Sequence, residues 1–484
     1  MLDSTEERLT EAATRWLGAL QQASSHDDVA RLFLGDSYWR DAVGLTWDLQ
    51  TIAGQAEIGA RLSSALNAGH AAFRIDRERP PAEVVRVDTL TIEAFFTFET
   101  ATGRGEGILR LCEDDDGTLR AWTFLTALRA LASHEEKTGA NRPTGKSYAR
   151  DFRGPNWLDE RRSAIAYADR DPAVLIVGGG QAGLSIAARL SQLGVDALII
   201  DRHPRIGDNW RKRYHALTLH NQVQVNHLPY MPFPPNWPTY IPKDKLANWF
   251  EAYVESLELN YWTSTVLISG RYNEAEGRWT AELRRDGADR TLHPRHIVMA
   301  TGVSGIPSIP QLPGLEDFAG QVVHSSAYDD GEDWAGKRAI VIGTGNSGHD
   351  ISQDLCSSGA NVVMVQRSPS MVVNIEPSAQ LPYSLYDQGL PMETCDLIVA
   401  SMPVPLTRRA HVSYTRRARE MDRQLLDRLE ARGFKLDYGE DETGWQFKYL
   451  TRGGGYYFNV GCSDMIADGR IDLIQFEDIE RFGP

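Results

Sequence analysis

The residues best suited to chemistry are the glycines of a turn near the middle of the chain. An apolar run at residues 173–177 leads into Gly178, Gly180 and Gly183, and a helical pattern follows to Leu190. In a strand–turn–helix unit, the first glycine allows the turn, the second lets the backbone approach a pyrophosphate, and the third packs helix against strand. The N–H groups at the helix start then face the pyrophosphate. The pattern predicts a dinucleotide site whose turn contacts are Gly178, Gly180, Gln181, Ala182 and Gly183.

An acidic residue stands where such a site needs one. The next apolar run, residues 195–200, ends at Asp201, which lies 18 positions beyond Gly183. A carboxylate at the end of this second strand can accept hydrogen bonds from ribose hydroxyl groups. Asp201 and the adjacent Arg202 are therefore expected to contact the dinucleotide.

A second turn of the same kind occurs later in the chain. The apolar residues 339–342 precede another glycine pattern, and a helical pattern follows it to Leu355. Two separate turns imply two dinucleotides. The contacts expected at this second turn are Gly343, Gly345, Asn346, Ser347 and Gly348.

The strand after the second turn ends differently from its counterpart. The strand predicted at 362–365 is followed by Gln366 and Arg367, and no acid stands there. An arginine at this position can pair with the 2′-phosphate of NADP. We therefore predict NADPH as the second dinucleotide, selected by Arg367. The alternative is that Arg367 is only a surface residue at a strand end.

The composition narrows the class of protein. The chain has 484 residues, of which 42% are hydrophobic and 24% charged, and its length suggests about three domains. A net charge of −15 argues against nucleic acid or an anionic membrane as the main partner. No run approaches 18 apolar residues, and the acidic start is unlike a signal peptide. We expect a cytoplasmic protein that acts on a small molecule, and a homo-oligomer stays an open alternative.

The four cysteines give no sign of a metal or disulfide site. Cys112, Cys356, Cys395 and Cys462 are far apart and form no metal-ligand spacing. No metal site is therefore expected, and free thiols fit a reducing compartment.

The first 130 residues predict a small α+β domain. Apolar residues recur at helical spacing over 9–20 and 58–66, and strands are predicted at 90–98, 107–113 and 119–128. Together with the stretches at 39–41 and 45–48, this region resembles the nuclear transport factor two-like (ketosteroid-isomerase-like) cone fold. That resemblance implies a pocket acid, for which the candidates are Asp36, Asp41 and Asp48. The alternative, which we prefer, is that these acids are turn and cap residues.

From residue 172 onward, the motifs resemble the flavin-containing monooxygenases (class B flavoprotein monooxygenases), in particular their plant auxin-pathway branch. The carrying motifs are GGGQAG at 178–183, Asp201, the stretch 207–210, LPYMPFP at 228–234 and ATG at 300–302. The resemblance implies that the first turn holds FAD and that Trp210 lies along the flavin. It also implies an asparagine that touches flavin and nicotinamide, and we assign Asn221, with Asn226 as a competitor.

A longer fingerprint supports the same resemblance. Residues 318–328 match FxGxxxHxxx followed by an aromatic residue, with His324 inside and Tyr328 at the end. Baeyer–Villiger monooxygenases usually end it in tryptophan, so Tyr328 favours the flavin-containing monooxygenase branch. A histidine can serve as a general acid or base, but for His324 we prefer a role in organising the segment between domains.

The predicted fold class is α/β, with two Rossmann-like domains for FAD and NADP preceded by the small α+β domain. The predicted segments are 1–130 (α+β domain), 131–171 (linker with a helix at 157–167), 172–330 (FAD domain), 331–450 (NADP domain with a helical insertion at 408–432) and 451–484 (return to the FAD domain). The resemblance implies an ATGY-type segment that closes the flavin site. The sequence given ends at Pro484, and we expect that segment to be absent from it.

The resemblance implies a function as well as a fold. An NADPH- and FAD-dependent monooxygenase would insert one oxygen atom of O₂ into a small organic substrate through a flavin hydroperoxide. The reaction would be N- or S-oxygenation or oxidative decarboxylation. The alternatives are a Baeyer–Villiger ketone monooxygenase and a nucleotide-binding remnant without turnover.

Overall fold

The computed structural model describes residues 4–69, 72–144 and 152–483. The chain divides into two compact units, each built from two stretches of sequence. Unit 1 comprises Met1–Glu136 and Leu385–His411, and unit 2 comprises Lys137–Ser384 and Val412–Pro484. Part of the linker predicted at 131–171, namely 145–151, lies outside the described residues. No helix within the described ranges is long and apolar enough to cross a membrane.

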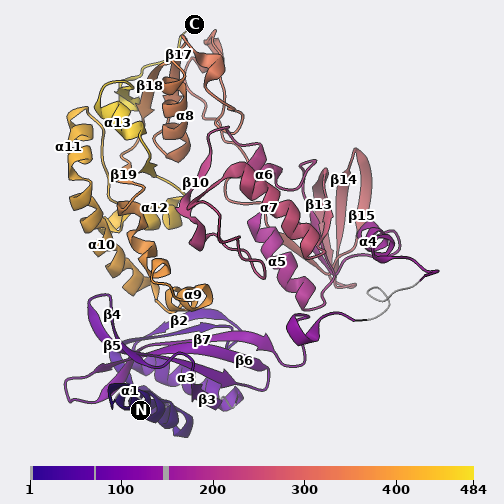
Figure 1. Ribbon diagram of the computed structural model, residues 1–484, viewed down its shortest axis with the longest axis vertical. Coiled ribbons are helices and arrows are strands. Elements are labelled where there is room, and N and C mark those ends of the chain that lie inside the picture. The colour runs from indigo at the N-terminus through magenta and orange to yellow at the C-terminus, as the bar shows by residue number, and fades with distance from the viewer. Residues whose placement is uncertain (1–3, 70–71, 145–151, 484) are drawn as a thin grey trace. The chain divides into compact units, whose positions relative to one another are not determined.

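Unit 1 packs helices against one face of a curved sheet (Figure 1). Its sheet order is β2-β1-β7-β6-β5-β3 with β4 paired to β5, and only β1 and β7 run parallel. Apolar side chains of α1 recur at helical spacing and are buried in the core of this unit, as predicted. The elements are α1 (Ser4–Gln22), α2 (His26–Ala30), β1 (Phe33–Ala42), β2 (Leu49–Ala53), α3 (Gln55–Gly69), β3 (Ala72–Ile75), β4 (Ala82–Arg86), β5 (Thr89–Glu99), β6 (Gly103–Glu113) and β7 (Leu119–Leu131).

The other face of this sheet is covered by a helix from far along the chain. Helix α9 (Met392–Ala400) brings Leu397 and Ile398 against Phe95, Ile108 and Leu125. Strand residues alternate between the two faces, so these three side chains point away from α1 and α3. Residues 385–411 therefore belong to unit 1, whereas the sequence placed them with the second nucleotide domain.

Unit 2 begins with a parallel sheet of order β12-β9-β8-β16. Its strands are short and apolar because both faces are covered, which is typical of parallel sheets. An antiparallel meander, β13-β14-β15, lies between β12 and β16 in the sequence. The elements are α4 (Trp157–Ala166), β8 (Val174–Val177), α5 (Gln181–Gln192), β9 (Ala197–Ile200), α6 (Asp208–Arg211), β10 (Thr218–Gln222), β11 (Tyr240–Pro242), α7 (Lys243–Ser256), β12 (Asn260–Trp262), β13 (Thr265–Asn273), β14 (Arg278–Arg285), β15 (Ala288–Leu292) and β16 (His296–Met299).

A second parallel sheet of unit 2 repeats the first, with order β17-β18-β21. A separate pair, β19 and β20, and a group of helices complete this half. Both Rossmann-type sheets predicted from the glycine turns are thus present, and the α/β fold class is confirmed. The elements are β17 (Arg338–Ile342), α8 (Asn346–Ser357), β18 (Asn361–Gln366), β19 (Met371–Asn374), η6 (Ser378–Asp387), α10 (Val404–Met421), α11 (Arg423–Ala431), α12 (Gly444–Arg452), β20 (Tyr456–Asn459), α13 (Cys462–Ala467) and β21 (Asp472–Gln475).

The structure modifies one segment prediction in this half and subdivides another. Residues 451–484 were predicted to return to the FAD domain. Strand β21 instead pairs with β18, because Ile471 and Leu473 pack into the core of the second sheet. Further along, the Phe482 N–H donates to the Pro313 carbonyl at 2.8 Å. The helical insertion predicted at 408–432 is helical, and it is divided at Asp422 into α10 and α11. The Asp422 carboxylate accepts hydrogen bonds from Asn374 and Ser378, which holds this junction against β19.

Candidate functional site

The first glycine turn has the geometry that a pyrophosphate site needs. Gly178 has φ of +110°, a region that favours glycine, and its N–H donates to the Ile200 carbonyl at 2.8 Å. A Cβ at Gly183 would lie 2.0 Å from the Gly178 oxygen, so α5 packs directly on the turn. Helix α5 starts after Gly180, which offers no side-chain cap. Its first N–H groups are therefore left for a ligand.

Asp201 lies at the carboxyl end of β9, next to this turn. Its Oδ2 accepts a hydrogen bond from the Gly179 N–H at 2.8 Å, and its Oδ1 accepts one from the His203 N–H at 2.9 Å. Burial acts to raise the pKa of the carboxyl, but these bonds and the His203 ring outweigh it and hold the pKa below its ordinary value. Asp201 is therefore an ionised acceptor at the edge of the turn. The Arg202 side chain donates a hydrogen bond to the Gly305 carbonyl at 3.0 Å.

A tyrosine that the sequence did not single out also borders the first turn. A Cβ added at Gly179 would lie 1.8 Å from the Tyr261 hydroxyl oxygen. Tyr261 is on β12, so its position depends on the pairing of β12 with β9, which no local motif reveals. The hydroxyl thus closes one side of the turn.

The second glycine turn repeats this geometry with more open space. Gly343 has φ of +119°, and a Cβ at Gly348 would lie 2.2 Å from the Gly343 oxygen. A Cβ at Gly345 would meet no described atom within 4 Å. Helix α8 begins after Gly345 without a side-chain cap. The Asn346 Oδ1 accepts from the Phe458 N–H of β20 at 3.1 Å, so this side chain is bonded to β20.

The two residues at the end of β18, Gln366 and Arg367, differ in whether their side chains are already hydrogen-bonded within the protein. Gln366 is buried and occupied, because it exchanges hydrogen bonds with the Lys435 backbone at 2.8 and 2.9 Å and accepts from Gln475 at 3.0 Å. Arg367 follows it and is exposed. Arg367 thus follows the carboxyl end of β18, where the Gly343 N–H of the glycine turn donates to the Val365 carbonyl at 3.0 Å.

Two of the predicted flavin contacts each have a buried polar atom without a hydrogen-bond partner among the described residues. They are the indole Nε1 of Trp210 and the side-chain oxygen of Asn221. Orphaned buried polar atoms are rare in folded proteins and fit a site built for a polar ligand such as the flavin ring. The residues present therefore fit the flavin that the sequence predicts.

The two candidate asparagines differ in their hydrogen bonds. Asn226 donates its side-chain N–H groups to the backbone oxygens of Asn221 and Gln222 at 3.0 and 2.8 Å, so it holds the turn. The Asn221 side chain is hydrogen-bonded to the Tyr383 hydroxyl and keeps its oxygen without a partner. Burial raises the pKa of Tyr383 to about 12, so the hydroxyl stays protonated. Asn221 is the better candidate for contact with a ligand.

His324 has a local structural role in the structure. Its Nδ1 lies 2.9 Å from the Ser326 hydroxyl and accepts from the Ser326 N–H at 3.1 Å. These contacts form a turn within the fingerprint, which agrees with the organising role that we preferred. The fingerprint ends at Tyr328, whose hydroxyl donates to Asp354 on α8 at 2.6 Å.

The acids proposed for unit 1 are not arranged as a catalytic site. Asp41 is buried, and its carboxylate accepts from the backbone N–H groups of Leu45 and Thr46 at 3.0 and 2.8 Å and from the Thr126 hydroxyl at 2.6 Å. Asp36 and Asp48 are exposed. Asp41 therefore organises the turn between β1 and β2, as its alternative interpretation held.

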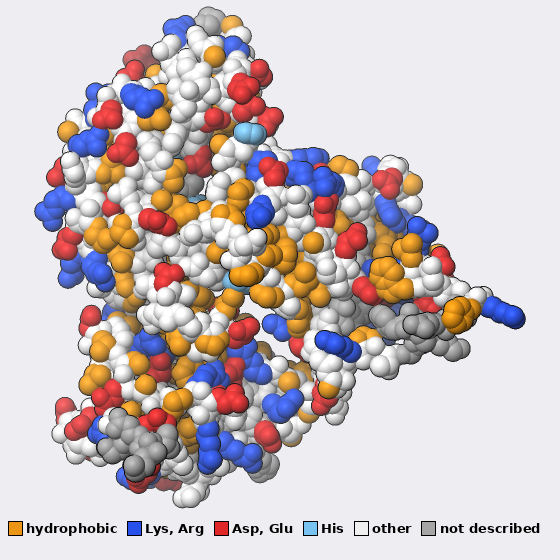
Figure 2. All heavy atoms as spheres, viewed as in Figure 1, with side chains coloured by type: hydrophobic (Ala, Val, Ile, Leu, Met, Phe, Trp, Pro, Cys, Tyr) orange, Lys and Arg blue, Asp and Glu red, His pale blue; other side chains and the backbone are white. Residues whose placement is uncertain are grey.

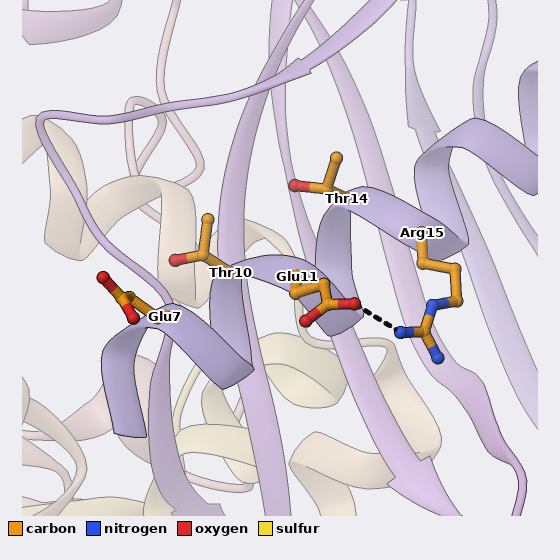
Figure 3. Close-up of a pocket in the computed structure, with 5 residues that line it drawn as sticks. All are labelled: Glu7, Thr10, Glu11, Thr14 and Arg15. Atoms are coloured by element: carbon orange, nitrogen blue, oxygen red, sulfur yellow. Dashed lines mark hydrogen bonds and ion pairs between the residues drawn. The ribbon is translucent and has the colours of Figure 1, made fainter. Parts of the chain in front are cut away.

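One hollow in unit 1 lies away from all these residues. Figure 3 shows its five lining side chains along the solvent side of α1, where Arg15 pairs with Glu11 at 2.7 Å. No predicted site residue lines it. The face seen in Figure 2 mixes acidic and basic side chains without one wide region of a single sign. Neither feature competes with the two glycine turns as a candidate site.

The comparisons with known proteins agree with this geometry. The family described as flavin-binding monooxygenase-like matches residues 171–412, half of the chain. Probable indole-3-pyruvate monooxygenase YUCCA7 of Arabidopsis thaliana is 32% identical over 316 residues, which cover 64% of this chain and 68% of that relative. Indole-3-pyruvate monooxygenase YUCCA1 of Oryza sativa subsp. japonica is 38% identical over 198 residues, covering 41% of this chain and 48% of the rice protein.

The extent of these matches is limited. The chain spans about half the length of the first curated relatives that it matches. Among solved structures, a flavin-containing monooxygenase from Stenotrophomonas maltophilia is 23% identical with a TM-score of 0.39, covering 48% of this chain and 67% of that chain. The family match over half of the chain and the long match to the Arabidopsis relative are sufficient to place it: the chain belongs to the flavin-binding monooxygenase-like family.

Proposed function

We propose that the chain is an NADPH- and FAD-dependent monooxygenase that transfers one oxygen atom of O₂ to a small organic substrate. The observation that carries the proposal is the pair of open glycine turns within one unit. One turn is bordered by the ionised Asp201, and the other by the exposed Arg367. An acid suits the ribose of FAD, and an arginine suits the 2′-phosphate of NADPH.

Each proposed cofactor has defined contacts in this chain. The N–H groups at the start of α5 would bind the FAD pyrophosphate, and those at the start of α8 would bind the NADPH pyrophosphate. Asp201 would accept from the FAD ribose, while Trp210 and Asn221 would offer their unpartnered Nε1 and Oδ1 to the ring systems. Bound FAD and NADPH would supply the oxygen activation and the hydride, and the protein would hold and orient them.

The residue chemistry is consistent with a cofactor-driven reaction. The neutral Tyr383 hydroxyl beside Asn221 can donate a hydrogen bond to a substrate or to a ligand carbonyl. A cluster of tilted and edge-to-face rings, Trp445, Tyr456 and Phe458, lies next to it, with ring centroids 4.8 to 5.6 Å apart. These apolar rings would keep water away from the reacting atoms.

Substrate and reaction type are also proposals. The relatives in rice and Arabidopsis are named indole-3-pyruvate monooxygenases. We therefore propose oxidative decarboxylation of an aromatic 2-oxo acid as the first reaction to test, followed by N- or S-oxygenation of amines and sulfides. The four free thiols support a cytoplasmic location.

Purification followed by turnover assays tests the proposal. A yellow protein with a flavin spectrum should oxidise NADPH in the presence of O₂, and mass spectrometry should find one oxygen atom from ¹⁸O₂ in the product. An ester formed from a ketone would instead favour a Baeyer–Villiger reaction. A colourless protein that binds NADP⁺ but neither retains FAD nor oxidises NADPH would favour the remnant and overturn the proposal.

A further inference from the structure

Helix α8 carries two acids, each of which accepts a hydrogen bond from a tyrosine hydroxyl. Tyr214 donates to Asp350 Oδ2 at 2.6 Å, and Tyr328 donates to Asp354 Oδ2 at 2.6 Å. Asp350 and Asp354 are four residues apart, so they lie one above the other on one face of the helix. Both tyrosines are buried, with 3% and 8% of their surface exposed. We call Tyr214 and Tyr328 the tyrosine pair.

The tyrosine pair comes from two segments that belong to the first half of unit 2. Tyr214 follows α6 by three residues and stands four residues after Trp210, the candidate flavin contact. Tyr328 is the last residue of the 318–328 fingerprint. The two segments are bonded to each other, because the His215 N–H donates to the Asp329 oxygen at 2.7 Å. Together they form a single support against α8.

The equivalent helix of the first sheet lacks these acids. When the third glycines of the two turns, Gly183 and Gly348, are matched, Asp350 corresponds to Ser185 and Asp354 to Arg189. A carboxylate near the start of a helix that binds a pyrophosphate repels the ligand and weakens binding. Its presence therefore calls for a separate structural role. The hydrogen bonds that these acids accept from the tyrosine hydroxyls provide that role.

The opposite side of α8 is fixed by packing. His349 stacks on Tyr457 with ring centroids 3.8 Å apart, and Ile351 and Leu355 are buried in the core of the second sheet. The helix is therefore held by its own sheet on one side and by the tyrosine pair on the other. The second contact connects it to the segment that carries Trp210.

We propose that Tyr214 and Tyr328 are positioning residues that set α8, and with it the bound NADPH, relative to the flavin site. The proposal rests on the proposed function, because it takes α8 as the helix that receives the NADPH pyrophosphate. Neither tyrosine touches the reacting atoms. Their hydroxyls fix the direction of the helix start, so hydride transfer should respond to their loss more than flavin binding does.

The test removes the two hydroxyls and leaves the rings. The variants are Tyr214→Phe, Tyr328→Phe and the double variant in the full chain, with Tyr167→Phe as matched control. Tyr167 donates to Asp196 at 2.6 Å, the same chemistry and distance, but it lies beside the first sheet and does not contact α8. Hydrogen exchange of residues 346–357 is measured without added ligand, and the NADP⁺ dissociation constant is measured by calorimetry. The rate of anaerobic flavin reduction by NADPH is then measured by stopped flow.

In the double variant, amides of α8 should exchange faster, and flavin reduction should slow by about tenfold, since each lost bond to a carboxylate is a charge-assisted one. Flavin content should stay at the wild-type level, and the Tyr167→Phe protein should behave like the wild type in exchange and reduction. Asp354→Asn keeps an acceptor oxygen for Tyr328, so its rate of flavin reduction should fall less than that of Asp354→Ala.

The outcomes separate this proposal from the proposed function. If the double variant keeps wild-type α8 exchange and wild-type reduction, the tyrosine pair does not position the helix. Equal slowing in Tyr167→Phe would mean a general loss of stability and would also overturn the proposal. A wild-type protein that fails to bind NADP⁺ would instead reject the proposed function, and the exchange of α8 would still report whether the pair holds the helix.

Discussion

At the scale of single residues, Gly345 and Gly348 stand three positions apart in one turn but have different surroundings. A Cβ at Gly345 would meet no described atom within 4 Å, whereas one at Gly348 would lie 2.2 Å from the Gly343 oxygen. Gly345→Ala should therefore leave the fold nearly intact and should lose NADPH binding, because the methyl group would occupy space meant for the pyrophosphate. We expect the NADP⁺ dissociation constant to rise by about tenfold or more. This corresponds to losing the binding free energy of about one charge-assisted hydrogen bond.

The companion variant provides the comparison. Gly348→Ala should lower the melting temperature clearly, because α8 would have to move away from the turn. Calorimetry for binding and circular dichroism for melting separate the two effects. Unchanged NADP⁺ binding in Gly345→Ala would show that the open space is not the pyrophosphate site.

Arg367 gives a prediction about cofactor choice. Gln366 is hydrogen-bonded to the Lys435 backbone and to Gln475, and the Lys435 Nζ pairs with Glu477, so the exposed Arg367 is the residue that we expect to bind the phosphate. Arg367→Ala should raise the KM for NADPH by about tenfold and leave that for NADH nearly unchanged, because only NADPH carries the 2′-phosphate. Arg338→Ala is a suitable control, since Arg338 is exposed at the other end of the same sheet. An equal effect of Arg367→Ala on both nucleotides would reject the phosphate role.

At the scale of elements, α8 should show a pH dependence that comes from Asp350. Burial raises the pKa of this carboxyl to about 6, despite the opposing hydrogen bond from Tyr214. The groups that face it do not titrate between pH 5 and 8. Burial lowers the pKa of His349 to about 4, and it raises the pKa values of Tyr214, Tyr457 and Cys462 above their ordinary values. Asp350 is therefore the group in this cluster that changes charge in that range.

The sign of the effect follows from linkage. Because the folded-state pKa is raised, the protonated carboxyl contributes stability in acid that is lost as the pH rises through about 6. Asp350→Asn keeps an oxygen for Tyr214 but cannot ionise. Its free energy of unfolding relative to the wild type should increase from pH 5 to pH 8, by roughly 2 kcal/mol at most. Urea unfolding at several pH values measures this, and parallel curves for the two proteins would contradict it.

The same helices show how far sequence alone leads. Helices α5 and α8 were predicted because glycine spacing and apolar periodicity are local signals. Strands β1 and β2 were missed, since their turn is held by the buried Asp41 carboxylate instead of by a recognisable turn pattern. Tyr214 and Asp350 are 136 positions apart, and no periodicity connects residues at that separation. Local motifs therefore located the turns, and the contacts that support them required the structure.

At the scale of the whole molecule, unit 1 depends on a segment that the sequence assigned elsewhere. Its sheet has two apolar faces, one covered by α1 and α3 and the other by α9. Residues 1–136 alone would leave Phe95, Ile108 and Leu125 uncovered. An exposed apolar face of this kind favours association or unfolding. The segment 385–411 should therefore be necessary for the stability of unit 1.

Substitutions within α9 test this dependence in the full chain. Leu397 and Ile398 are 3% and 4% exposed, whereas Val399 on the same helix is 50% exposed. Leu397→Ala and Ile398→Ala should each cost about 2 to 5 kcal/mol of unit 1 stability, because each leaves a cavity against the sheet. Val399→Ala should cost much less, since its side chain is half in water. Trypsin digestion followed by mass spectrometry would locate the loss, with early cleavage expected in 4–136 of the two core variants. If all three variants were cleaved like the wild type, the second face of the sheet would not need α9. Residues 385–411 would then not be necessary for the stability of unit 1.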